Sequence, residues 1–128
     1  MARILIIDDD AALRRTLRKM LQGTGHEIIE ATGGQEGVEL FRAQGADLVI
    51  SDLIMPNQDG IETIIALRAE QPDLKILAIS GAGRTDPGER LTDAVLLGAD
   101  ASLLKPVKMP ELRETVARLL ASGSASRS

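Results

Sequence analysis

The stretch Ile4-Leu5-Ile6-Ile7-Asp8-Asp9-Asp10 decides the fold, because a short apolar run stops abruptly at three carboxyl groups. Consecutive Ile and Leu residues without polar alternation are typical of a strand that is buried on both faces of a sheet. The change to Asp predicts that this strand delivers acidic groups at its carboxyl end.

Four further short runs follow, separated by segments with a helical period. The runs lie at His26–Ala31, Leu48–Ile50, Ile76–Ile79 and Ser102–Leu104. Between them apolar residues recur at helical spacing, as at Leu13, Leu17 and Met20. Five strands alternating with five helices predict β-α-β units, and therefore a parallel sheet with helices on both faces. Such sheets bind ligands at the carboxyl ends of the strands, where the strand order reverses.

The length and charge of the chain limit the number of domains and the kinds of binding partner that it can have. A chain of 128 residues is expected to form one domain, here residues 1–121, and the Ser- and Gly-rich residues 122–128 are expected to form a flexible tail. The formal net charge of -4 argues against a domain that binds nucleic acid or an anionic membrane surface. The longest early apolar run has four residues, too few for a signal peptide or a spanning helix, so we expect an intracellular protein.

Rare residue types exclude several chemistries. The chain has no Cys, which excludes disulfides, thiol nucleophiles and Cys-ligated metals. Its single histidine, His26, cannot form a His-rich metal site and is interpreted as a surface residue. Phe41 is the single aromatic residue, so aromatic platforms on which bases or sugars could stack are absent from the composition.

Helix boundaries are predicted from capping residues. Thr32-x-x-Gln35, Asp59-x-x-Glu62 and Asp86-x-x-Glu89 each match the pattern of a capping box. Gly residues at 23, 25, 45 and 98 are expected at helix ends.

Polar side chains that can take part in catalysis or binding follow four of the five predicted strands. They are Asp8, Asp9 and Asp10 after the first strand, Asp52 after the third, Ser80 after the fourth, and Lys105 with Pro106 after the fifth. A single Asp in such a place can also be a helix cap, which is the alternative for Asp10. Converging carboxylates without His or Cys form a site for Mg²⁺ or Mn²⁺. A lysine and a hydroxyl beside the metal would complete a phosphoryl-binding set, in which Asp52 on the central strand is the preferred nucleophile.

In these motifs the chain resembles the receiver domain of two-component response regulators, a family with the doubly wound, flavodoxin-like (βα)5 sandwich of the chemotaxis response regulator. The resemblance covers about residues 3–121 and rests on the acidic stretch quoted above, Asp52-Leu53-Ile54-Met55-Pro56, Ile76 to Ser80, Gly98-Ala99-Asp100 and Lys105-Pro106.

The resemblance implies a role for each matched residue. Asp52 is the expected phosphoacceptor, and Asp8 and Asp9 are the acidic pair that binds Mg²⁺, Asp9 directly and Asp8 mainly through water. The backbone carbonyl of Ile54 is a further expected metal ligand. Ser80 and Lys105 are expected to contact the phosphoryl group, and the Lys105-Pro106 peptide bond is expected to be cis.

The resemblance also implies a working cycle. A histidine kinase or a histidine phosphotransfer protein donates the phosphoryl group in the cytoplasm, and the altered surface binds a downstream protein. The chain itself is then no ordinary enzyme, because it catalyses only its own phosphorylation and dephosphorylation. We expect no direct contact with nucleic acid or membrane, and a monomer or a weak dimer linked to phosphorylation.

Some positions depart from the family pattern. Ser102 stands where the family usually has Tyr or Phe, so either the usual inward swing of that ring is lost or a strand residue is simply tolerated there. Ile54 and Ala82 offer no acid or amide to orient a water, which favours a long-lived phosphoryl group. The segment between Ser80 and Gly98 is about three residues longer than usual and is interpreted as a neutral surface insertion.

Several alternatives stay open at this point. Arg14, Arg15, Arg18 and Lys19 form a basic cluster that is either a solvated helix face or a surface for the phosphodonor. The domain could be a receiver-like adaptor that is never phosphorylated. A phosphohydrolase with an aspartyl nucleophile would usually carry a second acid at the position of Ile54, and a flavodoxin-like nucleotide binder would need aromatic residues.

Overall fold

Five parallel strands form one sheet in the computed structural model, which describes residues 2–52, 60–80 and 99–126. The strands are β1 (Arg3–Ile7), β2 (Glu27–Ala31), β3 (Leu48–Asp52), β4 (Lys75–Ser80) and β5 (Ala101–Leu104). Their order in the sheet is β2-β1-β3-β4-β5. The order reverses at β1 and β3, which makes the carboxyl ends of these two strands the expected place for a ligand site. The predicted parallel sheet is confirmed.

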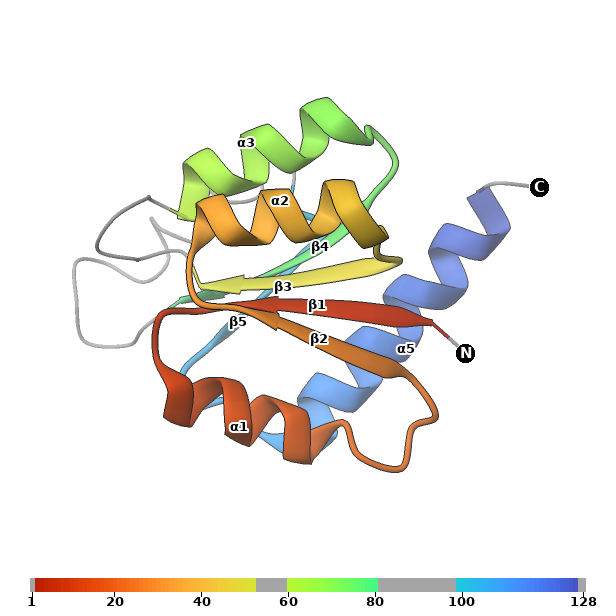
Figure 1. The fold of residues 1–128 in the computed structure, drawn as a ribbon. Helices are drawn as coiled ribbons and strands as arrows, with labels where there is room; N and C mark the ends of the chain where they lie inside the picture. The colour runs from red at the N-terminus through yellow and green to blue at the C-terminus, as the bar shows by residue number, and fades with distance from the viewer. Residues whose placement is uncertain (1, 53–59, 81–98, 127–128) are drawn as a thin grey trace.

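Helices cover both faces of this sheet. They are α1 (Ala11–Met20), α2 (Gly34–Gln44), α3 (Gly60–Glu70) and α5 (Met109–Ser126). Figure 1 shows α2 and α3 on one face and α1 and α5 on the other. The predicted helix near Leu91 and Val95, with its Asp86 cap, lies outside the described residues, as does the Asp59 cap of α3.

The sheet separates two apolar cores, and the alternation of side chains along each strand explains why its residues are apolar throughout. Leu5 and Ile7 of β1 point into the core under α2 and α3, whereas Ile4 and Ile6 point into the core under α1 and α5. All four are fully buried. Phe41 is buried in the first of these cores, so the single aromatic ring serves packing.

Asp10 and Thr32 lie near the starts of the first two helices, α1 and α2. Asp10 caps α1, because its Oδ1 accepts the N–H groups of Ala12 and Leu13 at 2.9 and 3.3 Å. The capping box Thr32-x-x-Gln35 is wrong. The N-cap of α2 is Gly33, whose backbone is extended, and the helix begins one residue later than expected. Glu36 takes the place of Gln35, because its Oε1 accepts from the backbone N–H and the hydroxyl of Thr32.

Helix α2 lies unusually close to β1. A Cβ atom added at Gly37 would lie 2.4 Å from Cδ1 and 2.7 Å from Cγ1 of Ile7. Both residues are buried, so any larger residue at position 37 would force the Ile7 side chain, α2 or β1 to shift. The contact fixes the residue that directly precedes Asp8.

The last helix is longer than the sequence composition suggested. The backbone of α5 stays helical to Ser126, past Ala121, where a flexible tail was expected to begin. The division of the chain into a domain over residues 1–121 and a tail over 122–128 stays a prediction. Among the residues that the structure describes, no helix combines the length and the apolar character needed to cross a membrane.

Candidate functional site

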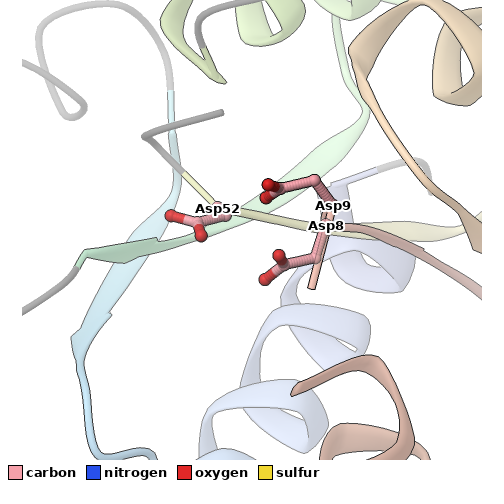
Figure 2. A group of neighbouring side chains, drawn as sticks. All are labelled: Asp8, Asp9 and Asp52. Atoms are coloured by element: carbon pink, nitrogen blue, oxygen red, sulfur yellow. The ribbon is translucent and has the colours of Figure 1, made fainter. Parts of the chain in front are cut away.

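Three aspartates from two neighbouring strands meet at the carboxyl edge of the sheet. Ile7 of β1 pairs with Ser51 of β3, so the next residues along each strand, Asp8 and Asp52, lie side by side. Oxygen atoms of Asp8, Asp9 and Asp52 all lie within 4.8 Å of one another. In Figure 2 the side chains of Asp8 and Asp9 project from the end of β1 toward Asp52. The predicted convergence of the first and third strands is therefore present.

The three carboxyl groups differ in exposure. Asp8 is 2% exposed and Asp52 is 6% exposed, whereas Asp9 is exposed to solvent. The start of the turn explains this difference, because Asp8 is still held beside β2 through its backbone N–H, whereas Asp9 begins the turn that leads to α1. The cluster thus combines two nearly buried carboxyl groups with one that solvent reaches.

Lys105 brings a positive charge to this cluster from the end of β5. Its Nζ donates to Oδ2 of Asp52 at 2.9 Å, and its side chain is 31% exposed. The Lys105-Pro106 peptide bond is cis, as expected. The lysine therefore contacts the carboxyl group that the sequence identifies as the nucleophile.

The charge of the cluster is incompletely balanced. The pKa of Asp8 is raised from 3.8 to about 6, chiefly by burial and also by the neighbouring charges of Asp52 and Asp9, against the opposing effects of the Asp10 N–H and Lys105. A raised pKa means that the fold resists a full set of ionised carboxylates. A proton on Asp8 or a cation among the three oxygens would relieve this repulsion.

The residues present fit a small divalent cation. The cluster offers carboxylate oxygens from three side chains, two of them in a nearly buried place, and the chain has no Cys that would favour a softer metal. Mg²⁺ and Mn²⁺ take oxygen ligands and keep several bound waters. Asp9 is exposed, so water can reach a cation bound at this cluster.

The turn that carries the acidic pair is held by several hydrogen bonds. The backbone N–H of Asp8 donates to the carbonyl of Ala31 on β2 at 3.1 Å, and the N–H of Asp10 donates to Oδ1 of Asp8 at 2.8 Å. Nη1 of Arg14 on α1 donates to the carbonyl oxygen of Asp8 at 2.7 Å. The acidic pair is therefore tied to both β2 and α1.

The remaining predicted site residues are only partly covered. Ile54 and Ala82 lie outside the described residues. Ser80 ends β4, where its backbone pairs with Leu104, but its side chain also lies outside the described part of the chain. The structure thus brings Asp8, Asp9, Asp52 and Lys105 together, and the roles of Ile54 and Ser80 stay predictions.

Ser102 lies in the middle of β5, opposite Ala78 of β4. It is partly buried, and strand alternation turns it away from Ala101 and Leu103, which pack with the core under α1 and α5. The hydroxymethyl group fills far less space than the ring that the resemblance would place there.

The basic cluster on α1 divides into two parts. Arg14 and Arg18 both bind Glu30 of β2, with N···O distances of 3.1 and 2.6 Å, so these two side chains are engaged within the domain. Arg15 and Lys19 are exposed. Sequence reasoning treated all four alike and missed Glu30. An acid inside the apolar run Ile28-Ile29-Glu30-Ala31 was the available signal.

Comparison with known proteins agrees with this geometry. Residues 4–117 match the family model described as "Response regulator receiver domain". The chain is 36% identical over 118 residues to the response regulator MprA of Mycolicibacterium vanbaalenii, a match that covers 92% of this chain and 50% of the relative. It is 35% identical to the probable transcriptional regulator ycf27 of Porphyridium aerugineum, covering 92% of this chain and 48% of that one. The chain thus spans about half the length of these curated relatives.

Solved structures resemble the whole of this fold. A CheY-like receiver domain protein from Methanospirillum hungatei JF-1 superposes with a TM-score of 0.89 at 26% identity, over 98% of each chain. NtrX from Brucella abortus superposes with a TM-score of 0.92 at 26% identity, over 98% of this chain and 28% of that one. The chemotaxis protein CheY4 of Vibrio cholerae gives 0.83 at 29% identity, over 93% and 98%.

Proposed function

Because the chain belongs to the response regulator receiver domain family, we propose that its Asp52 accepts a phosphoryl group from a phosphohistidine and that this changes the binding of a protein target. A histidine kinase or a histidine phosphotransfer protein is the proposed donor. The observation that carries the proposal is the contact of Asp52 with Lys105 inside a cluster that also contains Asp8 and Asp9. The family membership places the chain in two-component signalling.

The proposed step is a single displacement at phosphorus. A carboxylate oxygen of Asp52 forms the new O–P bond while the N–P bond of the phosphohistidine breaks, and the imidazole leaves with the electron pair of that bond. The ammonium group of Lys105 stands where it can bind an oxygen of the transferred group. The product is an aspartyl phosphate on β3.

Asp8, Asp9 and Asp52, together with the backbone carbonyl of Ile54, would hold the divalent cation, Mg²⁺ with Mn²⁺ as a possible substitute. When bound, the cation supplies positive charge that offsets the negative charge of the phosphoryl oxygens. The cation would also offset the charge of Asp8, because burial disfavours the ionised form of this carboxyl group.

The phosphoryl group is proposed to act as a local electrostatic switch. It adds a charge approaching -2 at the end of the central strand, beside Lys105 and the end of β4. Ser80 is the proposed hydroxyl partner of the phosphoryl group. Since Ser102 has no ring, we infer that the change reaches the surface without an inward-moving aromatic side chain.

The phosphorylated state is proposed to be long-lived. Neither Ile54 nor Ala82 has a side-chain acid or amide that could orient an attacking water. The decay of the phosphorylated protein, followed by mass spectrometry after the donor is removed, tests this hypothesis. A rate at the fast end of the family range would contradict it.

We propose that the domain acts in the cytoplasm as a monomer or as a weak dimer that forms on phosphorylation. The proposed output is contact with a protein, and direct binding of nucleic acid or membrane by this chain is not expected.

A direct experiment tests the phosphoacceptor. The protein is incubated with Mg²⁺ and a small-molecule phosphodonor, and its intact mass is measured. We expect the mass to increase by one phosphate in the wild type and not in Asp52→Asn, whereas Asp73→Asn, a control in a turn outside the cluster, should behave like the wild type. A phosphate that persists in Asp52→Asn, or no phosphate on the wild type, would overturn the proposal.

A further inference from the structure

Arg14 connects the acidic turn to the neighbouring strand. Its Nη1 donates to the carbonyl oxygen of Asp8 at 2.7 Å, and its Nε donates to Oε1 of Glu30 on β2 at 3.1 Å. The Arg14 side chain is 15% exposed, so water has little access to compete for these bonds. A single guanidinium group thus joins α1, β2 and the end of β1.

Arg14 contacts the backbone just beyond the end of β1, at the carbonyl of Asp8. The register pairs between β1 and β3 end at Ile7 and Ser51, so the Asp8 carbonyl lies beyond them, in the peptide that joins Asp8 to Asp9. Because a peptide unit is planar, fixing the direction of its carbonyl also fixes the N–H and the Cα atom of Asp9. Arg14 therefore acts on the peptide that connects the two acidic residues.

A second arginine holds Glu30 in place without touching this peptide. Arg18 donates from Nε to Oε2 of Glu30 at 2.6 Å and from Nη2 to the carbonyl of Ile28 at 3.3 Å. Glu30 also offsets part of the positive charge of Arg14, which reduces the repulsion between Arg14 and a cation bound nearby. The planar fork of arginine suits this task, since it serves two acceptors at fixed angles.

We propose that Arg14 is a positioning residue for the divalent-cation site, through the carbonyl of Asp8 and with Glu30 as its anchor. This inference rests on the proposed function, because it takes Asp8, Asp9 and Asp52 as the cation site. It assigns to Arg14 a role inside the domain, where the sequence had left it as one member of a basic surface cluster.

Two arginine variants separate this role from general stability. Arg14→Met removes both contacts, whereas Arg18→Met removes a bond to the same Glu30 and leaves the Asp8 carbonyl bound. Mg²⁺ affinity of each variant is measured by isothermal titration calorimetry, together with the urea unfolding of the metal-free protein. We expect the dissociation constant for Mg²⁺ to rise about tenfold or more in Arg14→Met and less than twofold in Arg18→Met.

Two further measurements keep the test decisive. Arg14→Lys retains the charge but not the fork, and we expect it to weaken Mg²⁺ binding as well. If Arg14→Met is poorly folded, this milder variant is compared with Arg18→Lys. In the metal-free protein, amide hydrogen exchange at Asp9 and Asp10 should be faster in the Arg14 variant than in its Arg18 counterpart.

The outcomes distinguish the inference from the proposed function. If the wild type binds Mg²⁺ and matched Arg14 and Arg18 variants bind it with equal affinity, the role of Arg14 is overturned and the proposed cation site stands. Wild-type protein that binds no Mg²⁺, or binds it equally after Asp52→Asn, would overturn the proposed cation site and the role of Arg14 with it. Loss of affinity that parallels loss of stability in both variants would also contradict a positioning role.

Discussion

The Nζ atom of Lys105 lies 2.9 Å from Oδ2 of Asp52, although 53 positions separate the two residues in the chain. This ion pair forms where β3 and β5 reach the same edge of the sheet on either side of β4. In the unmodified protein the lysine offsets the charge of Asp52, the proposed phosphoacceptor. To bind a phosphoryl oxygen it has only to exchange one oxygen partner for another close by.

Removal of Lys105 is expected to impair phosphorylation far more than folding. Lys105→Met removes the cation beside the acceptor, and loss of one preorganised charged donor typically lowers a rate by about 100-fold. Because its partner Asp52 is nearly buried, loss of the lysine leaves that charge less compensated, so the free energy of unfolding should fall by about 1–3 kcal/mol. The rate of phosphorylation by a small-molecule donor and the urea midpoint measure the two effects. Lys108→Met, at an exposed position, should change neither.

Asp8 is expected to destabilise the metal-free domain at neutral pH. Its pKa is raised from 3.8 to about 6, so the folded state holds this proton more tightly than the unfolded chain does. The free energy of unfolding should therefore fall as the pH rises from about 4 to about 6, by at most about 3 kcal/mol. Asp8→Asn should remove this fall and be the more stable protein at pH 7.

Urea unfolding followed by circular dichroism, with a chelator present, measures this effect at pH 4.5 and pH 7. Glu39→Gln, which changes an exposed carboxyl group on α2, is the matched control and should keep the pH dependence of the wild type. An Asp8→Asn protein that is less stable than the wild type at pH 7 would contradict the raised pKa.

Mg²⁺ is expected to stabilise the domain at pH 7 and to lose this effect on acidification. A ligand at a hundred times its dissociation constant stabilises by about 2.7 kcal/mol. Protonation of Asp8 at pH values below about 6 should weaken binding, because the cation then competes with a proton. Thermal melting with and without Mg²⁺ at pH 5 and pH 7.5 checks this, with NaCl at matched ionic strength as the control. A Mg²⁺-induced rise in melting temperature that is equal at both pH values would contradict the site. The same rise in Asp9→Asn as in the wild type would also contradict it.

Gly37→Ala is expected to disturb the acidic edge from a distance. The new methyl group would overlap the buried side chain of Ile7, so that side chain, α2 or β1 must move. Overpacking of this kind costs about 1–3 kcal/mol. Mg²⁺ affinity should also fall, because Ile7 directly precedes Asp8. Gly33→Ala, where no atom lies within 4 Å of the added Cβ, should have a much smaller effect on both.

The sheet and the main part of the cluster could be predicted from the sequence, since both follow from local patterns. Ile4 to Ile7 are apolar because both faces of β1 are covered, and that pattern alone locates the strand and its acidic end. Parallel strands then bring their carboxyl ends to one edge, which places Asp52 and Lys105 near Asp8 without further information.

Contacts that depend on side-chain reach could not be predicted in this way. Whether an arginine on α1 meets solvent or Glu30 depends on how α1 packs against β2, and Arg14 and Arg18 were therefore not distinguished from Arg15. The box at Thr32 failed because the extended Gly33 moves the helix start by one residue. The different burial of Asp8 and Asp9 likewise depends on where the turn begins.

Chemical trapping of the aspartyl phosphate identifies the phosphorylated residue itself. Protein treated with Mg²⁺ and a small-molecule phosphodonor is reduced with borohydride, which converts an aspartyl phosphate to homoserine, and its peptides are sequenced by mass spectrometry. We expect homoserine at position 52 alone. Homoserine at Asp8, Asp9 or any other aspartate, or none in a fully folded sample, would contradict it.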